Sequence, residues 1–282
     1  YDGASVMSGE LNGLQSKIKS LVPSALFTHC AAHRLNLVLQ QGTNGISKAR
    51  IFFATVLGIP AFFNQSPKRT FTLNNILKRS IPQANETRWC TRSKVVNLVH
   101  QEWDKLKVVF ETIVNDKSSG IESITKAQGF LKCFEDFDFA IFTVIYNNIF
   151  IITDPLFRIL QKKVLDVKYC FSQINMAVSP IKSLRNEITF TTIFECAKLR
   201  TGIPNKRGKV TDEAELITTY RILFYEILDC ITFQLDVRFT DLNKLEFLSL
   251  VDSAKYTDYR NEFPYEALNS LMKTLLRIEN SQ

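Results

Sequence analysis

Apolar residues recur every three or four positions along most of this chain, which is the spacing of one face of an α-helix. In the first part of the chain, this pattern predicts a helix over 3–21, a short buried strand over 25–30 and a second helix over 31–41. Pro23 would end the first helix, and Gly42 would end the second. Helix and strand in alternation are typical of an α/β part.

From about residue 47 the pattern predicts helices alone. The expected helices cover 49–63, 93–114, 121–134, 139–163 and 212–239. Pro60 would break the first of these, and 202–209 is the clearest loop. With only 10 Gly and 8 Pro in 282 residues, the chain has few helix breakers. The predicted fold class is therefore mainly α with a small α/β part.

One stretch, residues 139–152, is apolar enough to be compared with a membrane span. It is about 14 residues long, which is short of the roughly 20 residues that cross a bilayer. Acidic residues bound it at Asp136, Asp138 and Asp154. These features favour a buried core helix, and we expect no membrane partner.

Charge is distributed unevenly along the chain. Residues 1–110 hold 14 Lys and Arg against 5 Asp and Glu, whereas residues 111–282 hold 21 against 23. A concentration of positive charge is what binding to nucleic-acid phosphates requires. A solvated basic face without a ligand is the alternative.

The six cysteines are scattered and form no Cys-x-x-Cys pair, which is typical of reduced thiols in a cytosolic or nuclear protein. Cys30 and His33 have the spacing of half a zinc site, and His29 and Cys90 are the nearest further ligands. The alternative is a buried thiol beside a hydrogen-bonded imidazole. The chain begins with Tyr, inside a motif, so we expect it to be part of a longer protein.

Asp2 precedes a glycine at an expected strand-to-turn position. Carboxylates at strand ends hold the Mg²⁺ ions of two-metal phosphoryl transfer. A simpler role for Asp2 is to cap the helix that follows it.

Arg88, Trp89 and Arg92 place an indole between two guanidinium groups. This combination suits stacking on a base while the arginines bind phosphates. Alternatively, Trp89 anchors the helix that follows. The chain contains no Gly-rich phosphate loop, no Ser/His/Asp triad pattern and no dinucleotide fingerprint.

Several segments together resemble a known family. They are Asp2–Gly9, His29–Leu37, Thr87–Trp89, Tyr220–Asp229 and Gln234–Phe239. In this order they are similar to the hAT transposase superfamily, in its branch of domesticated zinc-finger MYM-type and THAP-type transposon-derived proteins. The resemblance covers nearly the whole chain.

The resemblance implies a fragment of a ribonuclease H-like core over 1–45, interrupted by a large all-helical insertion over 46–282. Asp2 matches the second acid of the family's Asp-Asp-Glu metal site. Cys30 and His33 match its Cys-x-x-His element. Arg88 and Trp89 match its Arg-Trp element, which is implicated in handling a flipped base.

The other two acids of that metal site have no match in these 282 residues. We therefore expect a catalytically incomplete segment that needs no cofactor, with Mg²⁺ bound only in a complete core. The expected function is that of a hAT transposase-like nuclear protein with DNA-binding heritage. The alternative is a non-enzymatic helical module that binds protein partners or associates with itself.

Overall fold

The computed structural model describes residues 5–23, 25–82, 89–161, 167–206, 209–210, 212–251 and 255–279. Two residues of the predicted site, Asp2 and Arg88, lie outside this described part of the chain.

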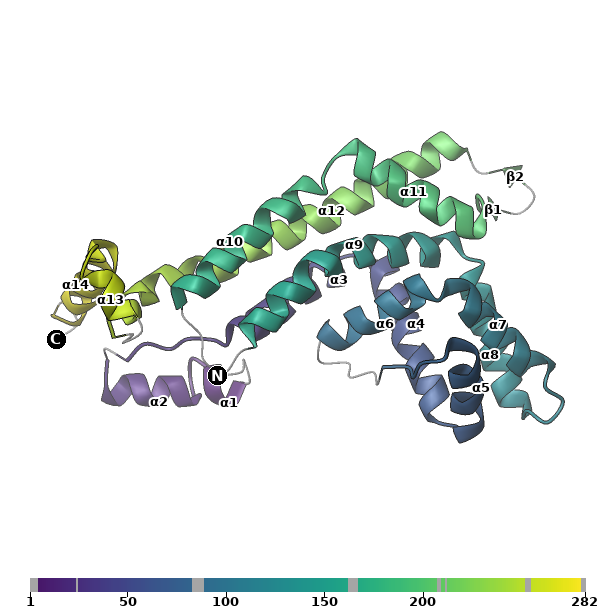
Figure 1. The fold of residues 1–282 in the computed structure, drawn as a ribbon, viewed down its shortest axis with the longest axis horizontal. Helices are drawn as coiled ribbons and strands as arrows, with labels where there is room; N and C mark the ends of the chain where they lie inside the picture. Colours follow the sequence, from purple (N-terminus) through teal and green to yellow (C-terminus); the bar gives the residue numbers. More distant parts are fainter. Residues whose placement is uncertain are drawn as a thin grey trace. The chain divides into compact units, whose positions relative to one another are not determined.

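The fold is mainly helical, as the apolar spacing predicts (Figure 1). In chain order the elements are α1 (Ser5–Ser8), α2 (Leu14–Leu21), α3 (Ala31–Asn44), α4 (Ser47–Asn64), α5 (Pro67–Leu77), α6 (Trp89–Gln101), α7 (Trp103–Asn115), α8 (Ile121–Phe134), α9 (Phe137–Leu160), α10 (Val167–Ser183), α11 (Glu187–Thr201), β1 (Asn205–Lys206), β2 (Lys209–Val210), α12 (Glu213–Phe239), the 3₁₀ helix η1 (Thr240–Val251), α13 (Tyr256–Tyr259) and α14 (Tyr265–Glu279). The strands β1 and β2 form a short antiparallel hairpin.

The chain folds as two compact units, each built from separate stretches of sequence. Unit 1 comprises Tyr1–Val38, Pro155–Ser179 and Thr232–Gln282, and unit 2 comprises Leu39–Asp154 and Pro180–Ile231. Helices α3, α9, α10 and α12 contribute residues to both units. The family resemblance places a boundary near residue 45, between the core fragment and the helical insertion. That boundary is a different division from the two units, and it stays a prediction.

In unit 2, helix α4 packs against α5, α6 and α8, while α7 packs against α5, α6 and α8. Aromatic rings fill the space between these helices. Phe62 and Phe63 lie against Phe110, with ring centroids 6.0 and 5.5 Å away. Seven of the chain's 22 phenylalanines lie on α4, α7 and α8, and large rings of this kind bury much apolar area per residue.

Helix α9 is long and apolar enough, by length and composition, to cross a bilayer. However, 72% of its most apolar 18-residue window is buried against the rest of the chain. Phe142, Ile145 and Phe150 are completely buried. This burial is that of a core helix, which is the environment predicted for residues 139–152.

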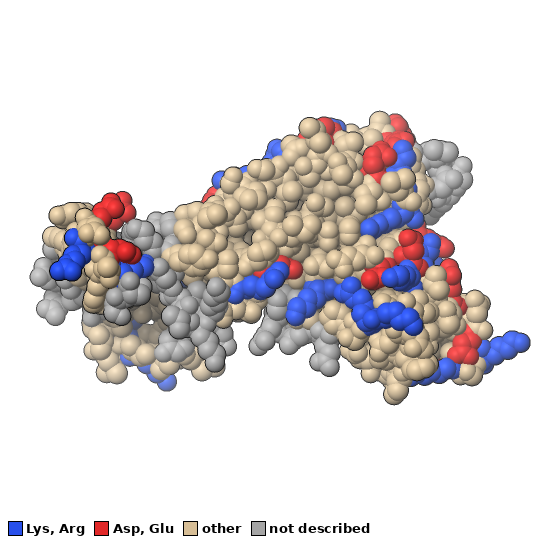
Figure 2. Space-filling view, viewed as in Figure 1, with Lys and Arg blue, Asp and Glu red and all other residues tan. Residues whose placement is uncertain are grey.

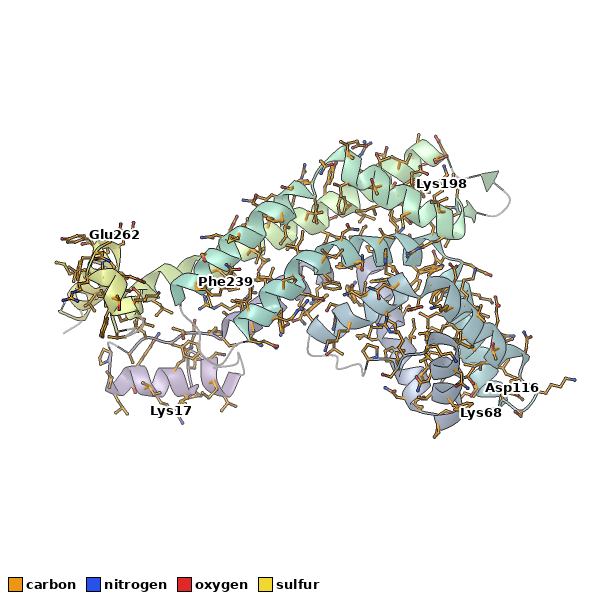
Figure 3. The ribbon with its side chains drawn as sticks, in the orientation of Figure 1. Lys17, Lys68, Asp116, Lys198, Phe239 and Glu262 are labelled. Carbon is orange, nitrogen blue, oxygen red and sulfur yellow. The ribbon has the colours of Figure 1, made fainter. Side chains whose placement is uncertain are left out.

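In unit 1, α14 packs against η1, and Tyr259 donates a hydrogen bond from its hydroxyl to the carbonyl oxygen of Ser249 at 2.7 Å. Phe239, at the end of α12, is buried (Figure 3). Helix α2 has no buried residue.

The strand predicted over 25–30 is wrong, because this stretch is irregular backbone. A strand persists only where its N–H and C=O groups pair with a neighbour, and short apolar runs do not reveal whether a neighbour exists. Within the described ranges, the β1–β2 pair is the only ladder. The described residues therefore hold no sheet of a ribonuclease H-like core.

Several helix boundaries also differ from prediction. The single helix expected over 3–21 is two helices, α1 and α2, with non-helical residues 9–13 between them. Pro60 does not break α4, which continues through it to Asn64. The single helix expected over 93–114 is two helices, because Glu102 leaves helical geometry with φ −109° and ψ 29° between α6 and α7. Position 102 has neither the glycine nor the proline that usually marks a helix end.

Candidate functional site

The predicted His-Cys-x-x-His segment lies at the start of α3, beside the end of α12, in unit 1. Arg34 donates from Nη1 to the carbonyl oxygen of Arg238 at 2.8 Å. Arg238 in turn donates from Nε to the side-chain oxygen of Gln234 at 3.0 Å. Two segments of the family resemblance, about 200 residues apart in sequence, are thus in direct contact, and a guanidinium binds one of the last carbonyls of a helix.

The imidazole and thiol groups of this segment do not gather around a common point. Cys30 is exposed, and the ring of His29 stands edge-on to that of Phe27 with centroids 4.8 Å apart. Partial burial, and then the positive charge of Arg34, lower the pKa of His29. Across the residues that the structure describes, no three His, Cys, Asp or Glu side chains could hold a metal ion together. Zinc binding by Cys30 and His33 finds no further ligand there.

Trp89 lies in the aromatic core of unit 2, with 3% of its surface exposed. Its ring meets that of Phe53 edge-on at 4.8 Å and lies 6.0 Å from the ring of Phe150. The guanidinium of Arg92 lies over the indole at 4.6 Å. In this packing the indole has no open face for a base, and the arrangement is that of a residue that anchors α6.

Arg92 itself lies against aromatic rings. Its Cζ is also 5.4 Å from the ring centroid of Phe53, so two cation–π contacts hold the side chain. The direct roles of Trp89 and Arg92 in DNA binding stay predictions, and they would require the pair to leave this packing.

Tyr146 extends the same core from α9. Its ring stacks on Phe52 at 5.8 Å and 7°, and its hydroxyl shares a hydrogen bond with that of Thr43 at 3.1 Å. Complete burial raises the pKa of Tyr146 well above its usual range. The phenol therefore stays neutral and acts as a structural group.

The surface of unit 2 carries cations of two kinds. Some are paired: Lys68 with Asp116, Arg79 with Glu102 at 3.6 Å, and Lys105 with Glu102 at 2.8 Å. In Figure 3, Lys68 and Asp116 lie close together at one end of α5.

Others are exposed and unpaired. Arg50, Lys78 and Lys94 are exposed, and among the described residues no carboxylate lies within 4.0 Å of their side-chain nitrogens. Figure 2 shows Lys and Arg side chains gathered over the region of α6. We call Arg50 of α4, Lys78 at the end of α5 and Lys94 of α6 the open basic set.

Sequence reasoning missed one polar cluster altogether. Lys48 Nζ lies 3.0 Å from Asp138 Oδ1, and the hydroxyl of Tyr220 donates to the same oxygen. The ammonium also lies 4.9 Å from the centroid of the tyrosine ring. The three residues come from α4, α9 and α12, and no local pattern connects positions so far apart.

The comparisons with known proteins show distant similarity to a curated human protein and no match to a family model. No protein-family model matches the chain, and no solved structure matches it. A human protein described as "52 kDa repressor of the inhibitor of the protein kinase" is 20% identical over 202 residues. The match covers 67% of this chain and 26% of the human protein, so the chain spans about a quarter of the length of that relative.

Proposed function

We propose that this chain is a segment of a hAT transposase-like nuclear protein with DNA-binding heritage, and that it contacts the DNA backbone through the open basic set of unit 2. The observation that carries the proposal is that Arg50, Lys78 and Lys94 are exposed without carboxylate partners among the described residues. They lie in a stretch, 47–110, with 11 Lys and Arg against 3 Asp and Glu.

Charge, and not stacking, is the chemistry that these residues offer. Lysine and arginine neutralise phosphates and release condensed counterions, which binds DNA of any sequence and weakens steeply with salt. The buried ring of Trp89 is not available to a base in this packing. Base handling by Arg88 and Trp89 therefore belongs to the resemblance and is not needed for this binding.

The family resemblance supports the proposal through residues in contact. Two of its segments, His29–Leu37 and Gln234–Phe239, are far apart in sequence. They are in contact through the hydrogen bond from Arg34 to Arg238. As part of the proposal, residues 1–45 descend from a ribonuclease H-like core and 46–282 from its helical insertion.

No DNA cleavage is proposed for these 282 residues. A two-metal site needs several carboxylates around its Mg²⁺ ions. Asp2 is the only match to those acids, and the described residues hold no metal-binding group of three acids, cysteines or histidines. Mg²⁺ would be a cofactor only of a core that contains the remaining acids.

The test is binding to a labelled duplex DNA across a salt series. Affinity should fall with salt, and the triple variant Arg50→Gln, Lys78→Gln, Lys94→Gln should bind more weakly, with a log–log salt slope shallower by about 2–3. The matched control, Lys132→Gln, Arg260→Gln, Lys273→Gln, removes the same charge from other exposed positions. Equal losses in both triples, or no binding at about 50 mM salt, would refute the proposal.

The alternative function is that of a non-enzymatic helical module that binds a protein partner or associates with itself. The name of the human relative describes a repressor of another protein's inhibitor, which is a role in regulating proteins. In unit 2, Ile188 on α11 and Ile222 on α12 are 81% and 61% exposed, and the ion pair between Glu187 and Arg221, at 3.0 Å, brings their neighbours together.

This alternative predicts a different pattern of sensitivity. Ile188→Ser with Ile222→Ser should weaken self-association, measured by sedimentation of nuclease-treated protein, while the open basic triple should not. If instead the open basic triple weakens DNA binding and the isoleucine variant leaves self-association unchanged, the DNA proposal is favoured.

A further inference from the structure

A small pocket in unit 2 is lined by residues that belong neither to the open basic set nor to the segments of the family resemblance. It has a volume of about 220 Å³ and lies between α4 and the junction of α8 with α9. Its apolar lining comes from the rings of Phe52, Phe139 and Phe142, with Ile51 beside them. Pockets for drug-sized ligands begin at about 300 Å³, so this one fits a single small group.

The polar residues of the pocket are mostly engaged already. Asp138 is paired with Lys48 at 3.0 Å and also accepts a hydrogen bond from Tyr220. Thr55 donates its hydroxyl to the carbonyl oxygen of Ile51 at 3.0 Å, so its hydrogen-bonding capacity as a donor is used within α4.

Asp136 differs from these residues. One of its carboxylate oxygens accepts the backbone N–H of Asp138 at 2.8 Å, and no Lys, Arg or His of the described chain lies within 4.0 Å of it. The pocket thus combines an aromatic lining, one neutralised ion pair and one carboxylate without a cationic partner among the described residues. Its net charge, from Lys48, Asp136 and Asp138, is −1.

The pocket is lined by one thiol, that of Cys133, and this thiol is not activated as a nucleophile. Burial, and then the charge of Asp136, raise the pKa of Cys133. The thiol therefore stays protonated near neutral pH and contributes to the lining as a small apolar group. The pocket is suited to binding and lacks an activated nucleophile.

We infer that this pocket binds a small organic cation: an ammonium group held by Asp136, with a short apolar body against Phe52, Phe139 and Phe142. Aromatic side chains attract both an apolar body and a positive charge. A neutral molecule of the same shape would keep the apolar contacts and lose the contact with the carboxylate.

Cys133 provides a direct measure of occupancy, because it lines the pocket and the exposed Cys30 lies in unit 1. The probe is phenethylammonium, compared with 2-phenylethanol as its neutral counterpart. Labelling by N-ethylmaleimide at pH 8, with each cysteine followed by mass spectrometry, reports protection of Cys133. Phenethylammonium should slow the labelling of Cys133 at a concentration about three- to fivefold lower than the alcohol does, and should not affect Cys30.

Two variants separate the charge from the cavity. Asp136→Asn keeps an acceptor for the N–H of Asp138 and should abolish the difference between the two probes, whereas the matched control Glu135→Gln should retain it. Thr55→Phe, which fills the pocket from α4, should abolish protection by both probes. Equal protection by ammonium and alcohol in the unaltered chain, or an unchanged difference in Asp136→Asn, would overturn the inference.

Discussion

Helices α2 and α4 have the same helical spacing of apolar residues but very different surroundings. In unit 2, α4 has eight buried residues: Ala49, Phe52, Phe53, Val56, Ile59, Pro60, Phe62 and Phe63. In unit 1, α2 has none, and Leu21 is 83% exposed. Periodicity predicts that a segment is helical, but it does not predict what covers the apolar face.

The composition of the two helices explains part of the contrast. Half of the buried residues of α4 are phenylalanines, and their rings can reach more than one neighbouring helix, as Phe62 reaches Phe110 on α7 and Phe130 on α8. The apolar residues of α2 are isolated aliphatic side chains between Lys17, Lys19 and serines. Large rings create many contacts per residue, so an aromatic helix is difficult to leave uncovered.

The sharpest way to break this comparison is to truncate one buried and one exposed side chain. Trp89→Ala should lower the free energy of unfolding by about 3–5 kcal/mol, because it leaves a cavity beside Phe53 and Phe150. Leu21→Ala, at a residue of α2 that is 83% exposed, should change it by less than about 0.5 kcal/mol. Urea denaturation followed by circular dichroism measures both.

The same experiment bears on the predicted DNA-binding role of Trp89. If Trp89→Ala were as stable as the unaltered chain, the indole would not be a core residue in solution, and a stacking role would gain support. Trp89→Phe, which keeps a ring in the core, should lose clearly less stability than Trp89→Ala.

A second test adds volume to the core instead of removing it. A Cβ at Gly42 would lie 2.6 Å from Cγ1 of Ile231, which is 1% exposed and cannot easily move. Gly42→Ala should therefore destabilise unit 2 by about 1–3 kcal/mol. At Gly45, just beyond the end of α3, a Cβ meets nothing within 4 Å, so Gly45→Ala is the matched control.

Gly42 also shows where sequence reasoning reaches its limit. The sequence predicted a helix end there, because glycine commonly follows the last helical residue. In the structure α3 continues to Asn44, and the glycine is needed where α12 passes close by. Close approach of residues 42 and 231 is a tertiary fact that local spacing does not contain.

The candidate site also combines features that local sequence predicts with features that depend on tertiary contacts. The excess of positive charge before residue 110 was evident from the sequence, and so was the possibility that Trp89 anchors a helix. The pairing of Arg79 with Glu102, and the cluster of Lys48, Asp138 and Tyr220, were not. Charge counts predict whether a surface is positive or negative overall. Which Lys and Arg side chains lack a carboxylate partner depends on the residues that the fold brings near them.

A third test concerns the protonation of His100, a half-buried residue of α6 in unit 2. Burial, and then Arg200, lower the pKa of His100 to about 4. Because the unfolded chain takes up this proton near pH 6.5, stability should be highest above pH 6.5 and fall as the pH drops towards 4. With His100 only half-buried, we expect a loss of about 1–2 kcal/mol between pH 7 and 4.5.

His100→Gln separates this effect from the carboxylates that titrate over part of the same range. The variant should show a shallower fall in stability between pH 7 and 4.5 in urea denaturation. If the free energy of unfolding fell equally with pH in the variant and the unaltered chain, His100 would be exposed to solvent in the folded protein.

The smallest expected effect has the opposite sign and comes from an exposed helix surface. Gly129 lies inside α8, is exposed, and a Cβ there would meet nothing within 4 Å. Gly129→Ala should therefore raise the free energy of unfolding by about 0.5–1 kcal/mol, because alanine loses less backbone entropy on entering a helix. Gly120, the N-cap of the same helix with φ −66° and ψ 151°, also has open space around it. Alanine caps a helix more poorly than glycine, so Gly120→Ala should be neutral or destabilising. If both substitutions stabilised the protein equally, the capping role of Gly120 would be refuted, because the lower entropy of the unfolded chain would then explain both effects.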